Sequence, residues 1–254
     1  MSFNLKKDLK FMLKNAGAFD VGIADPNRGF EQAIKERHPL ELWNKCKSVI
    51  VFVIARPPKS NNTYFGTYSP VNKRMYNPKK GGTGPVPQYF QSNDYGMTRL
   101  INMMSNNIKL KVMEFLKKRD YDFSFKKSQQ KLCAYEAGLG VYGRSGVIIH
   151  PVLGNRIKIS TILTDAEIPP DSPLIDFNPC KDCYTCVEMC PANAYDKNKE
   201  YPESWSRNIC TNKRAKFIEN NLYCHNCFAS CPAGKIKDEK LLNKEKAKSI
   251  YSKK

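Results

Sequence analysis

Eight of the ten cysteines stand in one stretch near the C-terminal end of the chain, and they restrict its fold more than any other feature. The first four read Cys180-x2-Cys183-x2-Cys186-x3-Cys190-Pro. The other four are Cys210, Cys224, Cys227 and Cys231, the last again followed by proline. In this spacing three neighbouring thiolates hold one 4Fe–4S cluster and the fourth ligates a second cluster. The sequence therefore predicts two interlocked clusters.

The ligand sets follow from the same rule. We assign Cys180, Cys183 and Cys186 to the first cluster, with Cys231 as its fourth ligand. The second cluster takes Cys210, Cys224 and Cys227, with Cys190 as its fourth ligand. Each cysteine before a proline is expected to end a local helix, because proline cannot donate the next backbone hydrogen bond.

A structural zinc site is the alternative interpretation of these cysteines. Zinc ribbons use two separated C-x2-C pairs for four ligands, whereas this chain adds a third cysteine at the same spacing and a fourth before proline. That difference favours iron and sulfide. A disulfide framework is less compatible with the sequence, because nothing at the N-terminus resembles a secretory signal.

The charge of the chain suggests classes of partner. Its 254 residues carry a formal charge of +18, and 41% of them are hydrophobic. Two oxidised clusters would lower the effective charge to about +14. This excess suits a polyanion such as tRNA, an acidic electron donor or a phosphate-bearing cofactor, although a solvated Lys-rich surface is the plainer explanation. No apolar run reaches the roughly 18 residues that span a bilayer, so we expect a cytoplasmic protein without a membrane partner.

The rest of the chain predicts a mixture of helices and strands. Apolar spacing from Leu5 predicts a helix that ends at Gly17. The runs 20–24 and 48–55 are apolar and β-branched, and the second is continuous enough for a strand covered on both faces. A long helix opens near Ser92, with an apolar face of Met97, Leu100, Ile101, Met104, Ile108, Val112, Phe115 and Leu116. The Pro-, Gly- and Tyr-rich segment 56–94 is interpreted as a loop folded over a flat ligand.

A glycine-rich segment precedes the cysteines. After a helix at 129–137, the chain reads Gly138-Leu139-Gly140-Val-Tyr-Gly143-Arg144-Ser145-Gly146, a composition that permits positive φ or close approach to a ligand. Such a loop can present backbone N–H groups to amides or phosphates, but it can also be a tight connection. The runs 147–150 and 157–163 flank Gly154-Asn155 and predict a hairpin within a mixed sheet.

Together these segments resemble a known family. The run 137–146, the run Ile159-Ser-Thr-Ile-Leu-Thr-Asp165 and the eight-cysteine arrangement are similar to the cobalamin-dependent iron–sulfur reductases, namely epoxyqueuosine reductases and reductive dehalogenases. The resemblance spans roughly residues 5 to 236. It identifies the chain as a short member that lacks the C-terminal helical-repeat extension of longer members.

The resemblance implies an α+β fold in three parts. Residues 1–176 would form a nitroreductase-like, mixed-sheet domain that binds base-off cobalamin, 177–236 a small ferredoxin-like domain with two 4Fe–4S clusters, and 237–254 a basic tail. The segment 138–146, through Gly138, Leu139, Gly140, Gly143, Arg144, Ser145 and Gly146, would contact the cofactor. The implied activity is reductive removal of oxygen or halogen, with single electrons arriving from a ferredoxin or flavodoxin.

Two departures from the family pattern concern the proton donor. Epoxyqueuosine reductases carry an Asp-Ser-x-Pro-like run where this chain reads 123–130 without an aspartate, and their Asp-Tyr-His run appears as Asp94-Tyr95-Gly96. Both differences argue against epoxide reduction on tRNA. Because reductive dehalogenases use a tyrosine acid backed by a basic residue, the resemblance favours Tyr95 as the acid, with Arg144 as its cation. Tyr89 and Tyr142 are the competing candidates.

Three other functions remain open at the sequence level. The chain can be an electron carrier or reductive activator that serves a partner protein, which would hold clusters but turn over no small molecule. The same fold can bind FMN instead of a corrinoid. A basic surface can also bind RNA, which a salt-dependent preference for tRNA would support. The reductase with a small-molecule or modified-nucleoside substrate is our first hypothesis.

Overall fold

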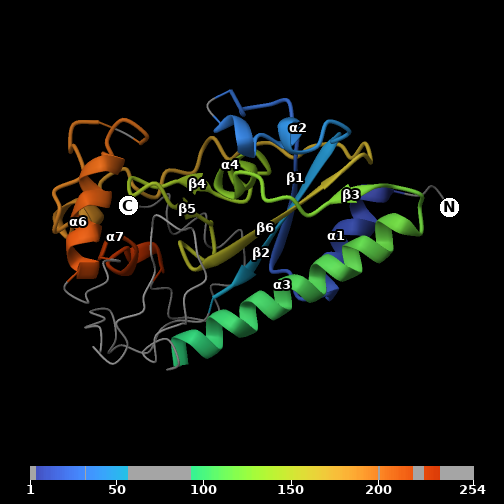
Figure 1. Ribbon diagram of the computed structural model, residues 1–254, viewed down its shortest axis with the longest axis horizontal. Helices are drawn as coiled ribbons and strands as arrows, with labels where there is room; N and C mark the ends of the chain where they lie inside the picture. Colours follow the sequence, from blue (N-terminus) through green and yellow to red (C-terminus); the bar gives the residue numbers. More distant parts are fainter. Residues whose placement is uncertain (1–3, 32, 57–92, 200, 220–225, 235–254) are drawn as a thin grey trace.

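The computed structural model describes residues 4–31, 33–56, 93–199, 201–219 and 226–234 (Figure 1). Its longer helices are α1 (Leu5–Asn15), α3 (Asn93–Lys117), α4 (Gln130–Glu136) and α6 (Arg207–Glu219). The short ones are η1 (Lys35–Arg37), α2 (Pro39–Leu42), α5 (Thr185–Glu188), α7 (Asn226–Ala229) and η3 (Pro232–Gly234). The strands are β1 (Asp20–Ala24), β2 (Ser48–Ala55), β3 (Phe123–Ser124), β4 (Val141–Tyr142), β5 (Ile148–Ile149) and β6 (Ile157–Thr164). In the described part of the chain, no helix has the length and apolar character needed to cross a bilayer.

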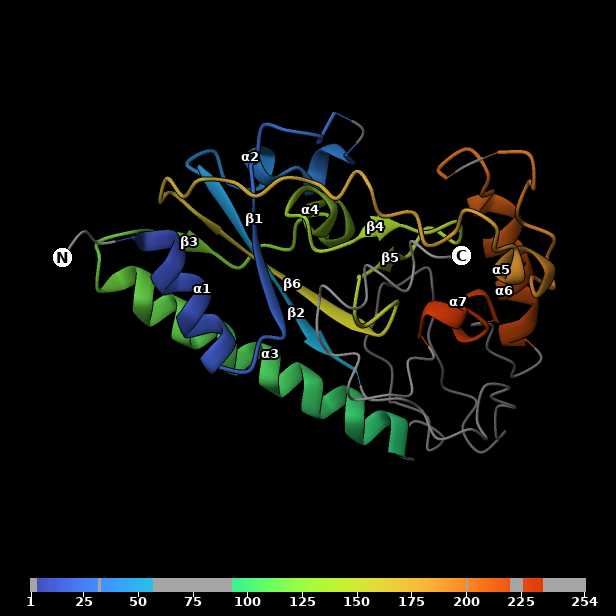
Figure 2. The same ribbon diagram turned by 180° about the vertical axis from the view of Figure 1, so that it is seen from behind.

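A four-stranded sheet in the order β1-β2-β6-β3 forms the centre of the fold. Its middle strands β2 and β6 pair along their full length, from Ser48 opposite Thr164 to Ala55 opposite Ile157. A separate two-stranded sheet, β4-β5, leads from the central sheet toward the cysteines. Helices α5, α6 and α7 gather beyond it at one end of the molecule (Figure 2).

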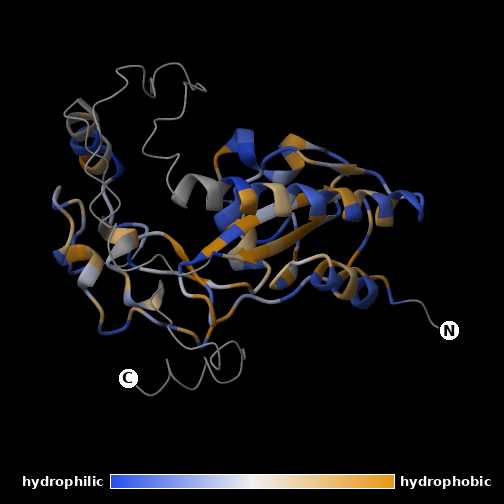
Figure 3. Cartoon of the chain, turned by 90° about the horizontal axis from the view of Figure 1, so that it is seen from below, coloured by the Kyte–Doolittle hydropathy of each residue, from blue (hydrophilic) through white to orange (hydrophobic). Residues whose placement is uncertain are grey.

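Helices cover both faces of the central sheet, which explains the continuous apolar run of β2. Ile50, Phe52 and Ile54 point into the core beneath α1 and α3. Val49, Val51 and Val53 point to the opposite core beneath α4. Successive side chains of a strand alternate between faces, so both sets must be apolar. Figure 2 shows α1 and α3 together on one side of the sheet, and Figure 3 shows its strands as mainly hydrophobic.

Two sequence predictions about the sheet are wrong. Every strand pairing in the described residues is antiparallel, whereas a mixed sheet was expected. The continuous apolar run 48–55 is, as predicted, a strand covered on both faces, but its pairing is antiparallel. The predicted hairpin is also absent from the described residues, because β5 pairs with β4 and β6 pairs with β2 and β3. In this region the structure has only an isolated bridge between His150 and Gly154.

The long helix α3 buries a narrower face than its sequence suggests. Ile101, Ile108, Val112 and Leu116 are fully or nearly buried against the sheet. Leu100, which the sequence places on that face, is 50% exposed, because the sheet contacts only one row of α3 side chains. Met97 lies outside the part of α3 whose side chains are described. Helix α1 ends as predicted, with Gly17 at φ +104°.

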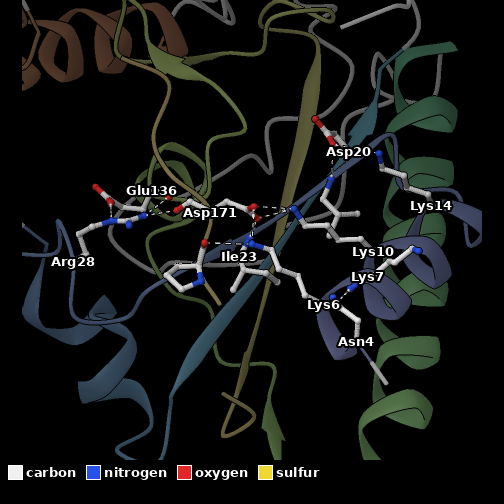
Figure 4. A network of polar contacts seen from close by, with 12 residues as sticks. Asn4, Lys6, Lys7, Lys10, Lys14, Asp20, Ile23, Arg28, Glu136 and Asp171 are labelled. Atoms are coloured by element: carbon white, nitrogen blue, oxygen red, sulfur yellow. Dashed lines mark hydrogen bonds and ion pairs between the residues drawn. The ribbon is translucent and has the colours of Figure 1, made fainter. Parts of the chain in front are cut away.

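A polar network fastens the segment after β6 to the N-terminal elements (Figure 4). Asp171 accepts hydrogen bonds from Lys10 Nζ at 2.7 Å and from the Ile23 N–H at 2.8 Å, and it pairs with Lys6 at 2.9 Å. Arg28 donates to the carbonyl oxygen of Asp171 and pairs with Glu136 at 2.8 Å. The connector to the cysteines is therefore anchored to α1, β1 and α4.

Replacing Asp171 with asparagine should destabilise the protein at neutral pH but not in acid. Burial opposes the charge of this carboxylate, yet its hydrogen bonds from Lys10, Lys6 and Ile23 outweigh burial and lower its pKa. A lowered folded-state pKa stabilises the fold above the unfolded value of about 3.9, and this stabilisation is lost as pH falls through the folded value. Urea unfolding should show a loss of roughly 1 kcal/mol at pH 7 that shrinks below about pH 4.

The control for this prediction is Asp176→Asn, which removes an exposed carboxylate of the same connector. Its unfolding free energy should match that of the wild type throughout the pH range. An Asp171→Asn variant with the same deficit at pH 3 and pH 7 would contradict the electrostatic explanation.

Candidate functional site

The cysteines lie on short helices and turns that follow the connector. Cys180 and Cys183 belong to a turn that leads into α5, and Cys186 lies within α5. Helix α6 carries Cys210, and α7 carries Cys227. Both cysteines that precede proline, Cys190 and Cys231, follow the ends of α5 and α7, as proline chemistry predicts. Cys224 lies outside the described residues.

The structure brings the first predicted ligand set together. Burial, together with the neighbouring thiols of Cys180, Cys231 and Cys183, raises the pKa of the Cys186 thiol to about 12, and Cys227 of the second set contributes as well. Cys231 comes from far along the chain, yet it packs against the same apolar group as β4 and β5. Buried thiols of this kind become stable thiolates only when a positive centre binds them.

Three members of the second predicted set line one cavity of about 390 Å³, here called cavity B. They are Cys190, Cys210 and Cys227, and Tyr195 lies beside them. The wall also contains Arg56, Lys131, Lys213 and Arg214. Cationic side chains around thiolates reduce the repulsion between their negative charges.

Within the described ranges, no three His, Cys, Asp or Glu side chains are close enough to hold a single metal ion. A 4Fe–4S cluster binds each thiolate through a different iron atom, so its ligands stand further apart than the ligands of one ion. The donor chemistry of both cysteine sets, sulfur only and partly buried, suits such a cluster.

The hairpin β4-β5 contributes residues 145–147 to cavity B and Val141, Tyr142 and Arg144 to a second cavity. This second cavity, here called cavity A, measures about 690 Å³ and is lined by Tyr135, Tyr142, Arg144, Phe177, Cys180 and Tyr201 among others. The rings of Tyr142 and Tyr201 stack with centroids 5.0 Å apart. Burial raises the pKa of Tyr142 above its ordinary value, so this phenol stays protonated at neutral pH. An aromatic cavity of this volume beside Cys180 has the size and lining of a small-molecule site.

Arg144 holds the first cysteine turn in place. Its backbone N–H donates to Cys180 Sγ at 3.4 Å, and its guanidinium donates to the carbonyl oxygens of Cys180 and Cys183, each at 3.3 Å. The guanidinium also lies 4.3 Å over the ring of Tyr184. A side chain with these contacts positions the ligands. Its predicted role as a cation for a catalytic tyrosine remains a prediction.

The glycines of the 138–146 segment are needed for packing within the chain. A Cβ on Gly140 would lie 2.6 Å from the carbonyl oxygen of Ile149, and one on Gly143 would lie 3.3 Å from Cys180 Sγ. Gly138 and Gly146 adopt positive φ. The N–H groups of Gly138, Leu139, Gly143 and Gly146 donate to carbonyl oxygens of the chain. Ser145 and Gly146 line cavity B, whereas Arg144 lines cavity A. Cofactor contact through this segment remains a prediction.

The remaining candidates are placed as follows. Tyr95 lies in the first turn of α3, but its side chain and all of Tyr89 are outside the described part. His38 caps α2 by accepting from the Leu40 N–H, and His150 Nδ1 accepts from Val152 and Leu153 in a fully buried position. His225 lies outside the described residues.

The two cysteines outside the clusters are buried, as the sequence suggests. Cys46 is 4% exposed and Cys133 is fully buried. Burial raises the pKa of each thiol to about 12. Neither is therefore a nucleophile in the folded chain at neutral pH.

Comparison with known proteins relates this chain to two groups of reductases. Epoxyqueuosine reductase of Staphylococcus aureus (strain NCTC 8325 / PS 47) is 34% identical over 107 residues, which is 39% of this chain and 28% of that protein. Tetrachloroethene reductive dehalogenase of Desulfitobacterium hafniense is 32% identical over 123 residues, or 41% and 22% of the two chains. The chain is a homologue of both reductases. No family model matches it.

Solved structures give the same result for the fold. An epoxyqueuosine reductase determined with an epoxyqueuosine-modified tRNA stem loop superposes with a TM-score of 0.60 at 20% identity, covering 95% of this chain and 68% of that one. The alignments with the two curated reductases cover less than a third of either relative. The resemblance read from the glycine segment and the cysteines is thus confirmed at the level of homology and fold.

Proposed function

We propose that this homologue is a cobalamin-dependent iron–sulfur reductase that passes single electrons from two 4Fe–4S clusters to a base-off corrinoid. The reaction would remove halogen or oxygen reductively from a small molecule or modified nucleoside. The single observation that carries the proposal is the gathering of Cys190, Cys210 and Cys227 around cavity B, next to the thiols of Cys180, Cys183 and Cys231 around Cys186. Two neighbouring groups of thiols are what a two-cluster electron path requires.

The residues of this chain would perform distinct tasks in that reaction. Arg144 fixes the turn of Cys180 and Cys183, and Tyr195 donates a hydrogen bond to Cys227. Tyr135, Tyr142 and Tyr201 line cavity A with aromatic surface, which suits a flat ligand beside Cys180. When bound, the corrinoid supplies a low-potential cobalt nucleophile, which protein side chains alone cannot provide.

Tyr195→Phe should lower the reduction potential of the cluster that Cys227 binds. Burial and the neighbouring Cys227 raise the Tyr195 pKa, so its phenol remains a hydrogen-bond donor. A hydrogen bond to cluster sulfur stabilises the more negative, reduced state. Removing about 1 kcal/mol of such stabilisation shifts a one-electron potential by roughly 40 mV downward. Redox titration followed by electron paramagnetic resonance measures this shift.

A matched control is Tyr184→Phe, which keeps the ring beneath Arg144 and removes a hydroxyl outside cavity B. We expect its cluster potentials to equal those of the wild type. Equal potentials in Tyr195→Phe and the wild type would show that this hydroxyl does not contact a cluster ligand.

The proposed activity is tested by reoxidation of the reduced protein. The reconstituted chain with cobalamin is reduced by a low-potential donor and mixed with an aryl halide, an alkyl halide or an epoxide nucleoside. At least one compound should accelerate reoxidation. Tyr95→Phe should slow this step by about 10²-fold without changing iron or cobalt content, if Tyr95 supplies the proton.

Two outcomes oppose the proposal. Reoxidation that no compound accelerates, in a protein that still reduces a partner such as ferredoxin, would indicate an electron carrier. A flavin spectrum in the purified protein would replace the corrinoid by FMN. A Tyr95→Phe variant with wild-type rates would exclude Tyr95 as the proton donor and leave the rest of the proposal unchanged.

A further inference from the structure

A third cavity, of about 400 Å³, lies between α3, the segment 125–130 and β6, apart from both cysteine sets. Its lining includes three lysines, Lys109, Lys127 and Lys158, one from each of these three parts of the chain. Asn102, Asn106 and Gln130 add amide groups, and Phe125 is the single aromatic ring among the lining residues. We call this the lysine cavity.

Hydroxyl groups form the buried part of the lysine cavity. Ser105 Oγ and Ser160 Oγ lie 2.7 Å apart, and their residues are 4% and 1% exposed. Thr161, also in the lining, accepts from Ser128 at 3.1 Å. A hydroxyl that shares one hydrogen bond can still take part in another, so these groups can contact a ligand.

The three lysines repel one another in the absence of a ligand. Burial and the charge of Lys127 lower the pKa of Lys109. Burial, Lys127, Arg56 and Lys109 lower that of Lys158. No described carboxylate forms an ion pair with any of the three. Like charges are costly when they converge without a counterion, which indicates a place for an anion.

We propose that the lysine cavity binds the phosphate group of a small phosphorylated molecule. Three ammonium groups are better balanced by a dianion than by a single carboxylate. Donors approach from three parts of the chain and include amides and hydroxyls, which suits the oxygens of a tetrahedral anion more than a planar carboxylate. Lysine binds phosphate as a point charge, so no fixed fork geometry is needed.

The shape of the site favours a small molecule over a nucleic-acid backbone. The lysines converge on one cavity, whereas a polynucleotide is followed by cations spaced along a surface. The lining contains none of the described cysteines, so the inference does not rest on the clusters. Its test requires no substrate turnover.

Calorimetric titration of the reconstituted full-length protein tests the inference at constant ionic strength. Inorganic phosphate and glycerol 3-phosphate should each bind saturably at one site. Lys158→Gln and Lys109→Gln should each weaken binding by about ten- to a hundredfold, because each removes a charged hydrogen bond. Lys158→Arg should retain most of the affinity. The control Lys111→Gln removes an equal charge from the exposed part of α3 outside the cavity and should bind as the wild type.

The two anions and the thermal melts separate the outcomes. Tighter binding of glycerol 3-phosphate identifies an organic ligand, and tighter binding of inorganic phosphate identifies the free ion; either supports a phosphate site.

Without phosphate, both glutamine variants should melt no lower than the wild type, since the repulsion between the lysines is relieved. Added phosphate should raise their melting temperatures less than that of the wild type. Equal losses in Lys111→Gln, no saturable binding, or binding of single-stranded RNA alone would each overturn the inference.

Discussion

Alanine at both Cys190 and Cys210 should leave about four irons per chain after anaerobic reconstitution, one intact cluster of two. Both cysteines line cavity B, so the double variant removes ligands of one cluster only. Alanine at both Cys190 and Cys183 should leave almost no cluster iron, because Cys183 lies near Cys186 and is assigned with it to the other set. Each variant removes two thiols. The variants differ only in whether these thiols belong to one cluster or to two.

The iron count distinguishes crossed ligation from ligation by consecutive cysteines. If Cys180, Cys183, Cys186 and Cys190 held one cluster, the Cys190/Cys183 pair would be the variant that retains four irons. Cys133→Ala is the matched control, since this buried thiol lies outside both sets. It should keep about eight irons. Colorimetric iron and sulfide determination on desalted protein gives the answer directly.

Arg28→Ala should lower the free energy of unfolding by about 3–5 kcal/mol. The Arg28 side chain pairs with Glu136 at 2.8 Å and donates to the carbonyl oxygens of Glu136 and Asp171 at 2.7 and 2.6 Å. The Glu136 side chain is only 6% exposed, so removing its partner leaves a buried carboxylate without a counterion. Such a charge costs more than the lost contacts themselves.

Urea unfolding of single and double variants separates the cost of the unpaired charge from the cost of the lost contacts. Glu136→Ala leaves Arg28, whose side chain is 38% exposed and can reach water, so its cost should be smaller, about 2–3 kcal/mol. The double variant should be more stable than the sum of the single losses predicts, since no unpaired charge remains. Arg37→Ala, an exposed arginine on η1, should change stability by less than about 0.5 kcal/mol. Additive losses in the double variant would contradict the ion-pair explanation.

Local patterns in the sequence were sufficient for several elements of the fold. The β-branched run 48–55 is strand β2, Gly17 follows the end of α1, and the predicted helix 129–137 is α4 within one residue at each end. These features depend on side-chain pattern and backbone freedom, which the sequence carries directly. The cysteine spacing also places Cys180 and Cys183 near Cys186, because short loops restrict which thiols can meet.

Long-range contacts were not predictable in the same way. The partner of β5 is β4 and not β6, a choice that depends on the course of the chain between the two sheets. Arg28, Glu136 and Asp171 carry no local signal, since each stands alone in the sequence and the network exists only after folding. Lys109, Lys127 and Lys158 look like ordinary surface lysines until the fold brings them to one cavity. Charge pairing and convergence are properties of tertiary structure.

The most direct test of the proposed function is metal analysis of the purified chain. The protein is reconstituted anaerobically with iron and sulfide, incubated with cobalamin and desalted. We expect about eight irons and about one cobalt per chain, with no zinc. Eight irons without retained cobalt would contradict the corrinoid reductase and indicate an electron-transfer protein. Zinc in place of iron would contradict the assignment of both cysteine sets.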